Sequence, residues 1–284
     1  MQKKGFLSYN QNMDRSTNFP DINRLSIVAG VIILLYATIP FVNLPSQQIN
    51  INFFSIVFAY RLDFTSIISI LVAVLAASGS DWLVQSHPHR DSHSFIRHGF
   101  IPALTAWVIG VPLSSLSIGP EWWVVLALGG LLLILVFISE YIVVDPHSAA
   151  HVPASMGLTA VSFALYLTLA ITVRAAGLRL FLLAPALVIS LFLLVLRSIN
   201  LRAPFGSWNY YWATGISIFI GQLVVGLHYL PINSIVFGLV LVAIAYSLTL
   251  FAENLEEGVI GNKLWIEPLI IFSILIFISL VIKI

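Results

Sequence analysis

Nine long apolar runs constrain what this chain can fold into more than any other feature of its sequence. Crossing about 30 Å of hydrocarbon takes roughly 20 helical residues, and runs near that length recur along the chain. Only 9% of the residues are charged, far fewer than in soluble domains. The sequence therefore predicts an all-α polytopic transmembrane helix bundle of nine spans, at about 25–42, 64–84, 100–117, 121–144, 154–174, 178–199, 210–229, 233–252 and 264–283.

The segment ahead of the first apolar run is polar and contains no small-residue cleavage site after a short apolar stretch. We therefore expect residues 1–24 to form a polar cytoplasmic tail, and the first span to act as its own insertion signal. Residues 25–284 are predicted to form a single transmembrane domain.

Basic residues predict how the spans are oriented, because cytoplasmic loops are enriched in Lys and Arg. With the N-terminus inside and the C-terminus outside, nine basic residues fall on the cytoplasmic side and four on the other. This orientation predicts a multi-pass protein of the cell membrane. The nine are Lys3, Lys4, Arg15, Arg24, Arg90, Arg97, Arg197, Arg202 and Lys263, and the four are Arg61, Arg174, Arg179 and Lys283.

Between the first two runs, residues 47–62 alternate apolar and polar side chains, as a half-buried strand does. We expect a small β-hairpin on the extracytoplasmic membrane surface, and a re-entrant or irregular loop is the alternative.

Prolines mark helix starts, because the first turn tolerates a residue without an N–H. Pro102, Pro120, Pro153 and Pro268 are predicted to occupy first turns, whereas Pro185 lies inside a span and predicts a kink. The paired Trp122 and Trp123 are typical of the headgroup boundary.

Four of the seven histidines lie within one predicted cytoplasmic loop, residues 85–99, and a second loop, 145–152, opens on the same face. Each loop contains a His-x-x-x-His pair, a spacing that on a helix directs two imidazoles to one metal. A divalent metal is thus one hypothesis, and its candidate ligands are His89, His93, His147 and His151.

The pattern partly resembles the histidine boxes of membrane desaturases and hydroxylases, which hold two irons at the cytosolic face. Those enzymes also use adjacent His-His pairs, which this sequence lacks. A haem between His98 and His151 is another alternative. The plainest alternative is a solvated polar loop that binds nothing.

Acidic residues collect at the predicted cytoplasmic ends of the spans. Two interpretations stay open for them: an ion-pair belt that ties spans together, or the lining of a cavity open to the cytoplasm. The candidate catalytic residues, drawn from these acids and the histidines, are His87, His98, Glu140, Asp145 and Asp81.

A net charge of +1 argues against nucleic acid as a partner, and the absence of cysteine excludes thiolate chemistry. The leading hypothesis is an accessory or assembly protein without enzymatic activity, which interacts with the lipid bilayer and with other membrane proteins. The alternatives are a membrane enzyme acting on a lipid or other apolar substrate at the cytoplasmic leaflet, and a small-molecule transporter.

Four phrases of the sequence, SDWLVQSHP, RHGFIPALTAWVIG, EYIVVDP and RAAGLRLFLLAPAL, resemble those of an uncharacterised bacterial family of multi-spanning membrane proteins. The resemblance covers about residue 25 to the C-terminus. It implies a membrane location but does not indicate any activity, because the family is a domain of unknown function.

Overall fold

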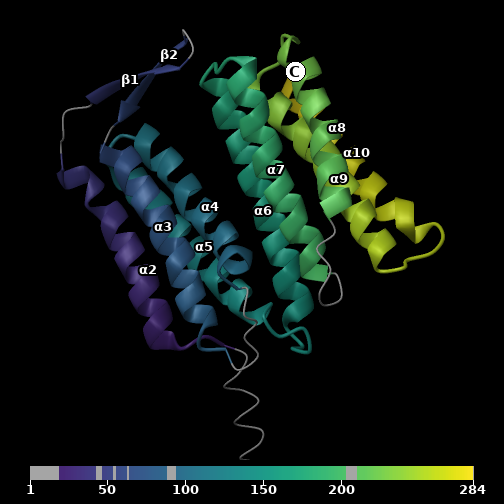
Figure 1. The fold of residues 1–284 in the computed structure, drawn as a ribbon, viewed down its shortest axis with the longest axis horizontal. Helices are drawn as coiled ribbons and strands as arrows, with labels where there is room; N and C mark the ends of the chain where they lie inside the picture. Colours follow the sequence, from purple (N-terminus) through teal and green to yellow (C-terminus); the bar gives the residue numbers. More distant parts are fainter. Residues whose placement is uncertain are drawn as a thin grey trace, which may run out of the picture. The chain divides into compact units, whose positions relative to one another are not determined.

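The computed structural model describes residues 19–42, 47–53, 56–62, 64–87, 94–202 and 210–283. The chain divides into two compact units, Met1–Ala154 and Ser155–Ile284, each of which is a helical bundle (Figure 1). The prediction that residues 25–284 form one transmembrane domain stays a prediction.

Among its described residues, unit 1 contains four long helices. Helices α3, α4 and α5 pack against one another, and α2 packs on α3 and α5. A short 3₁₀ helix follows α2, and two strands follow it. The elements are α2 (Ile22–Ala37), η1 (Ile39–Phe41), β1 (Gln47–Phe53), β2 (Ile56–Leu62), α3 (Phe64–Val84), α4 (Ser94–Ser115) and α5 (Pro120–Ile142).

The described part of unit 2 contains five helices, the first of which begins just before the boundary between the units. Helices α7, α8 and α9 pack against one another, and α10 packs on α9. The elements are α6 (His151–Ala175), α7 (Leu180–Arg202), α8 (Tyr210–His228), α9 (Ser234–Glu256) and α10 (Lys263–Lys283).

Eight of these helices are long and apolar enough to cross a membrane, which confirms a multi-pass membrane architecture. They correspond to eight of the nine predicted spans. The remaining predicted span, 100–117, corresponds to α4, where the apolar helix His98–Ser114 is shorter than the other eight. Hydropathy locates the helices because burial in lipid depends on each segment's own side chains.

The segment for which the sequence predicts a hairpin forms two antiparallel strands (Figure 1). Their register runs from Gln47 opposite Leu62 to Phe53 opposite Ile56. The position of this pair on the outer membrane surface stays a prediction.

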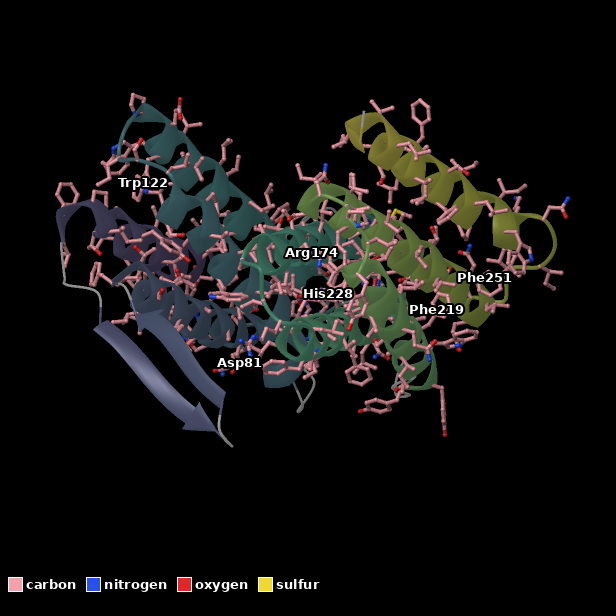
Figure 2. All side chains as sticks on the ribbon, turned by 90° about the horizontal axis from the view of Figure 1, so that it is seen from above. Asp81, Trp122, Arg174, Phe219, His228 and Phe251 are labelled. Carbon is pink, nitrogen blue, oxygen red and sulfur yellow. The ribbon has the colours of Figure 1, made fainter. Side chains whose placement is uncertain are left out.

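Trp122 is completely buried within unit 1, where its indole Nε1 donates to the carbonyl of Leu113 at 3.0 Å (Figure 2). Its neighbour Trp123 is 44% exposed. The two tryptophans thus have different surroundings within the protein, and the prediction that both lie at the headgroup boundary stays a prediction. Hydropathy does not reveal that the carbonyl of Leu113, near the end of α4, is available as an acceptor.

The prolines divide into two groups. Pro120 is the first residue of α5, and Pro153 lies in the first turn of α6, as predicted. Pro102 and Pro268 lie inside α4 and α10, so the prediction of first-turn positions is wrong for them. Helix α4 begins at Ser94, six residues before its predicted run, because polar residues can extend a helix beyond the hydrocarbon. Helix α10 begins at Lys263, one residue before its run, which places Pro268 in its second turn.

Candidate functional site

A histidine and a glutamate pair inside unit 1. His98 Nδ1 lies 2.9 Å from Glu140 Oε2, and the side chains are only 8% and 1% exposed. His98 lies in the second turn of α4, and Glu140 lies two residues before the end of α5. A carboxylate on Nδ1 favours the tautomer with its proton there, which leaves the lone pair on Nε2. This arrangement orients an imidazole for proton exchange or for binding a metal.

Pro102 explains a second contact of His98. A proline at this position has no N–H to donate to the carbonyl four residues earlier, which is that of His98. The hydroxyl of Ser80 on α3, which is itself buried, donates to this carbonyl at 2.7 Å instead. The contact ties α3 to α4 at the level of the imidazole.

His87 reaches the same region from the end of α3. Its ring packs edge-on against Tyr141, with the ring centroids 4.8 Å apart, and only 4% of His87 is exposed. Tyr141 follows Glu140 directly in α5. His98 and His87 therefore each contact the last turn of α5, His98 at Glu140 and His87 at Tyr141.

Two further predicted residues have local contacts instead. Asp81 Oδ2 accepts a hydrogen bond from the Gln85 side chain at 2.7 Å, one turn along α3 (Figure 2 labels Asp81). Asp145 Oδ1 accepts from the backbone N–H of His147 at 3.0 Å and thereby closes the turn after α5. The hydrogen bond that the structure gives Asp145 thus stays within its own loop.

The interpretation of the first histidine stretch as a fully solvated loop is wrong for His87 and His98. Both are buried, and His98 belongs to a helix that begins at Ser94. Hydropathy did not reveal that α4 begins at Ser94, because the first turns of this helix are not apolar. His89 and His93 lie outside the described residues.

The second histidine pair does not share a helix. The His147 side chain is 89% exposed in the turn before α6, whereas His151 is half-buried as the first residue of α6. Among the residues that the structure describes, no three His, Asp or Glu side chains are grouped to hold a metal ion. The metal hypothesis also involves His89 and His93, so it stays a prediction.

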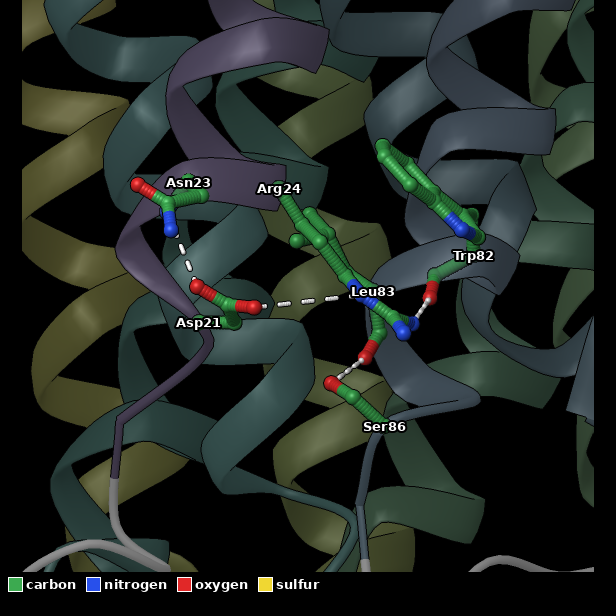
Figure 3. Close-up of polar contacts among 6 residues, drawn as sticks. All are labelled: Asp21, Asn23, Arg24, Trp82, Leu83 and Ser86. Carbon is green, nitrogen blue, oxygen red and sulfur yellow. Dashed lines mark hydrogen bonds and ion pairs between the residues drawn. The ribbon is translucent and has the colours of Figure 1, made fainter.

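A network at the start of α2 fixes the same end of unit 1 (Figure 3). Asp21 caps α2 by accepting from the N–H of Asn23 at 2.9 Å. Arg24 donates to the carbonyl of Trp82 at 3.1 Å and lies over its ring, 5.2 Å from the centroid. These contacts bind α2 to the last turn of α3, just before His87.

Unit 2 contains a buried carboxylate of its own, which the sequence did not single out. Glu253 Oε1 on α9 lies 2.9 Å from Ser198 Oγ on α7, and this oxygen lies 3.0 Å from Thr159 Oγ1 on α6. All three residues are 1% exposed. Ser198 has one proton, so we infer that it donates to the carboxylate and accepts from Thr159.

Glu253 lies on the buried face of α9. Thr249, one turn earlier on α9, is completely buried, and residues four apart share a helix face. The predicted span ended at residue 252, which left Glu253 as a residue of the membrane surface. Since α9 continues to Glu256, the carboxylate lies inside the bundle.

Unit 2 also has an apolar groove between α6, α9 and α10. Its lining includes Phe163 and Tyr246, whose rings are 4.8 Å apart, and Ile271 of α10. These residues lie near the middle of their helices, where a membrane helix meets hydrocarbon.

Comparison with protein families matches residues 44–282 to a family described as a protein of unknown function (DUF5656). No curated protein matches this chain. No solved structure matches it either.

Proposed function

We propose that this chain, which belongs to the DUF5656 family of unknown function, is a cell-membrane enzyme. In this proposal the His98–Glu140 pair moves a proton. The substrate proposed is a lipid or another apolar molecule with a polar head at the cytoplasmic leaflet. The observation that carries the proposal is the 2.9 Å contact between His98 Nδ1 and Glu140 Oε2, nearly closed to solvent.

The membrane orientation belongs to the same proposal. We take α4 as the ninth span, because its 22 residues pack between α3 and α5. Nine spans place the termini on opposite sides, and the nine-to-four distribution of basic residues favours a cytoplasmic N-terminus. His87, His98 and Glu140 then all lie near the cytoplasmic ends of their helices.

In the proposed chemistry, His98 Nε2 is the general base and Glu140 is a positioning residue. Glu140 holds the imidazole in one tautomer and stabilises the imidazolium that forms when Nε2 accepts a proton. The proton would come from a hydroxyl of the head group or from a water molecule beside it. An ionisable group within a transmembrane segment is rarely retained without a function, because burying it is unfavourable.

The test uses the full chain in phosphatidylethanolamine–phosphatidylglycerol vesicles to which a total membrane lipid extract is added. Mass spectrometry of the lipids before and after incubation is expected to show a new product with the wild type and with Glu121→Gln. Glu121 is the control because it is an exposed acid in the first turn of α5, at the other end of the helix from Glu140. Glu140→Gln and His98→Gln are expected to lose it. No product with the wild type, or loss only in variants that fail to fold, contradicts the proposal.

A second measurement needs no substrate. Nitrogen NMR of labelled histidine is expected to report His98 as the Nδ1–H tautomer, and Glu140→Gln is expected to change its signals. A signal of His98 that is indifferent to Glu140→Gln would remove the reason for giving Glu140 a positioning role.

The accessory or assembly protein remains the second candidate, and the enclosure of the pair favours it. With 8% and 1% exposure, His98 and Glu140 also serve as a structural tie between α4 and α5. Purification in mild detergent distinguishes the two functions: an accessory protein is expected to co-purify with other membrane proteins and to turn over no lipid.

The transporter alternative receives less support. It requires a polar cavity that reaches the midplane, and Gln222 is the main polar side chain deep in the predicted spans. Gln222 lies on an exposed face of α8, so it does not line the interior of unit 2.

A further inference from the structure

One face of α8 is exposed along the whole helix with a regular spacing. This exposed face also includes Thr214, Phe219 and Gly226. Along its length, one line of positions follows alternate steps of four and three residues, which is the spacing of a heptad seam between two helices. The opposite face, which includes Ile220 and Val224, is buried. The seam consists of Tyr211, Gly215, Ile218, Gln222, Val225 and Tyr229, the last of which directly follows α8.

Gln222 makes this face unlike an ordinary lipid-facing surface. It lies six residues before the end of α8, which is about 9 Å along the axis. That distance exceeds the reach of its side chain to the membrane surface. An amide exposed to hydrocarbon without a hydrogen bond is unfavourable by several kcal/mol. Within the described part of the chain, the structure shows no hydrogen bond from the Gln222 side chain.

We propose that the seam of α8 is the interface of a homodimer, with the two Gln222 amides hydrogen-bonded to each other across a two-fold axis. Each amide has both a donor and an acceptor, so Gln222 is complementary to itself. All copies of a chain insert in the same orientation, so a second copy brings its own Gln222 to the same depth. An unrelated partner would need a polar group at that same depth.

The remaining seam residues suit a close crossing of two parallel helices. Gly215 lies in open space, where even an added Cβ would have no atom within 4 Å. Small residues allow helix backbones to approach in membranes, and a buried polar residue fixes the register of a helix pair. Ile218 and Val225 lie on either side of Gln222 and would supply the apolar packing of the interface.

The absence of cysteine from the chain permits a direct test. Gln222→Cys in the full chain, in its membrane, is expected to give a disulfide-linked dimer under mild oxidation. Ile218→Cys and Val225→Cys are expected to do the same. Leu128→Cys is the matched control, because Leu128 is 61% exposed within α5 and lies outside the seam. Cross-linking at position 128 as strong as at 222 overturns the proposal.

A substitution of the amide tests the hydrogen bond without cysteine. Gln222→Leu keeps the face apolar, so the chain is expected to fold while its dimer affinity in vesicles falls roughly three- to thirty-fold. Subunit counting by single-molecule photobleaching measures this change. A wild type that is monomeric, or a Gln222→Leu dimer of unchanged affinity, overturns the proposal. A Gln222→Cys variant that cross-links only to another protein does so as well.

Discussion

The guanidinium of Arg174 donates a hydrogen bond to the backbone carbonyl of His228 at 3.1 Å, which joins the end of α6 to the end of α8 (Figure 2). Its other contacts extend this junction. Arg174 Nη1 lies 3.0 Å from His228 Nδ1, Nη2 donates to the carbonyl of Leu230, and the group lies over the Phe237 ring. One side chain therefore holds the connection between α8 and α9.

Arg174→Ala is expected to loosen that connection, because hydrogen bonds from a charged group contribute about 1.5–3 kcal/mol. Hydrogen exchange measured by mass spectrometry should become faster in residues 229–233 and stay unchanged in the middle of α9. Arg179→Ala is the control, because Arg179 is exposed and its substitution removes the same charge from the same end of the unit. Equal acceleration in both variants would attribute the effect to charge alone.

Two buried tyrosines should respond differently to removal of their hydroxyls. Tyr36 donates to the carbonyl of Ala106 and thereby joins α2 to α4. Tyr36→Phe is therefore expected to lower the free energy of unfolding by about 0.5–1.5 kcal/mol. The Tyr166 hydroxyl is buried and has no hydrogen bond within the described residues, so Tyr166→Phe should be neutral or stabilising. Thermal unfolding in detergent measures both, and a larger loss for Tyr166→Phe would contradict this view.

The contact of α2 with α3 depends on the absence of a side chain at Gly79. A Cβ at this position would overlap Cγ1 of Val28, and valine has little freedom to move away. Gly79→Ala is expected to destabilise the protein by about 1–3 kcal/mol, as overpacking does. Unfolding midpoints should show recovery when Val28→Ala is added. Gly30→Ala on α2, where a Cβ meets nothing within 4 Å, should be tolerated.

The buried carboxylate of unit 2 should depend on the hydroxyl of Ser198. Ser198→Ala removes the donor that lies 2.9 Å from Glu253 Oε1, so we expect a loss of about 1–3 kcal/mol in stability. In combination with Glu253→Leu, which removes both acceptor oxygens, the two losses should not add, because each variant breaks the same contact. Additive losses in the unfolding free energy would show that the two side chains act independently.

The positions of the helices, and of the two strands between α2 and α3, could be predicted from the sequence. Each of these depends on properties of neighbouring residues, namely hydropathy over about twenty positions and alternation over seven. The helix ends were less well predicted where polar residues extend a helix, as at Ser94 before α4 and at Glu253 in α9. Hydropathy measures transfer into lipid, whereas a helix ends where its hydrogen bonds end.

Which polar residues contact one another could not be predicted from the sequence and follows from how the helices pack. His98 and Glu140 are 42 residues apart, and Ser198 and Glu253 are 55 apart. Sequence analysis named His98 and Glu140 as separate candidates. The residues next to them in the sequence do not indicate that the second turn of α4 faces the last turn of α5. Partner choice depends on how the helices rotate and cross when their surfaces pack. Periodicity can show which face of a helix is buried, but the side chain opposite it is set by packing alone.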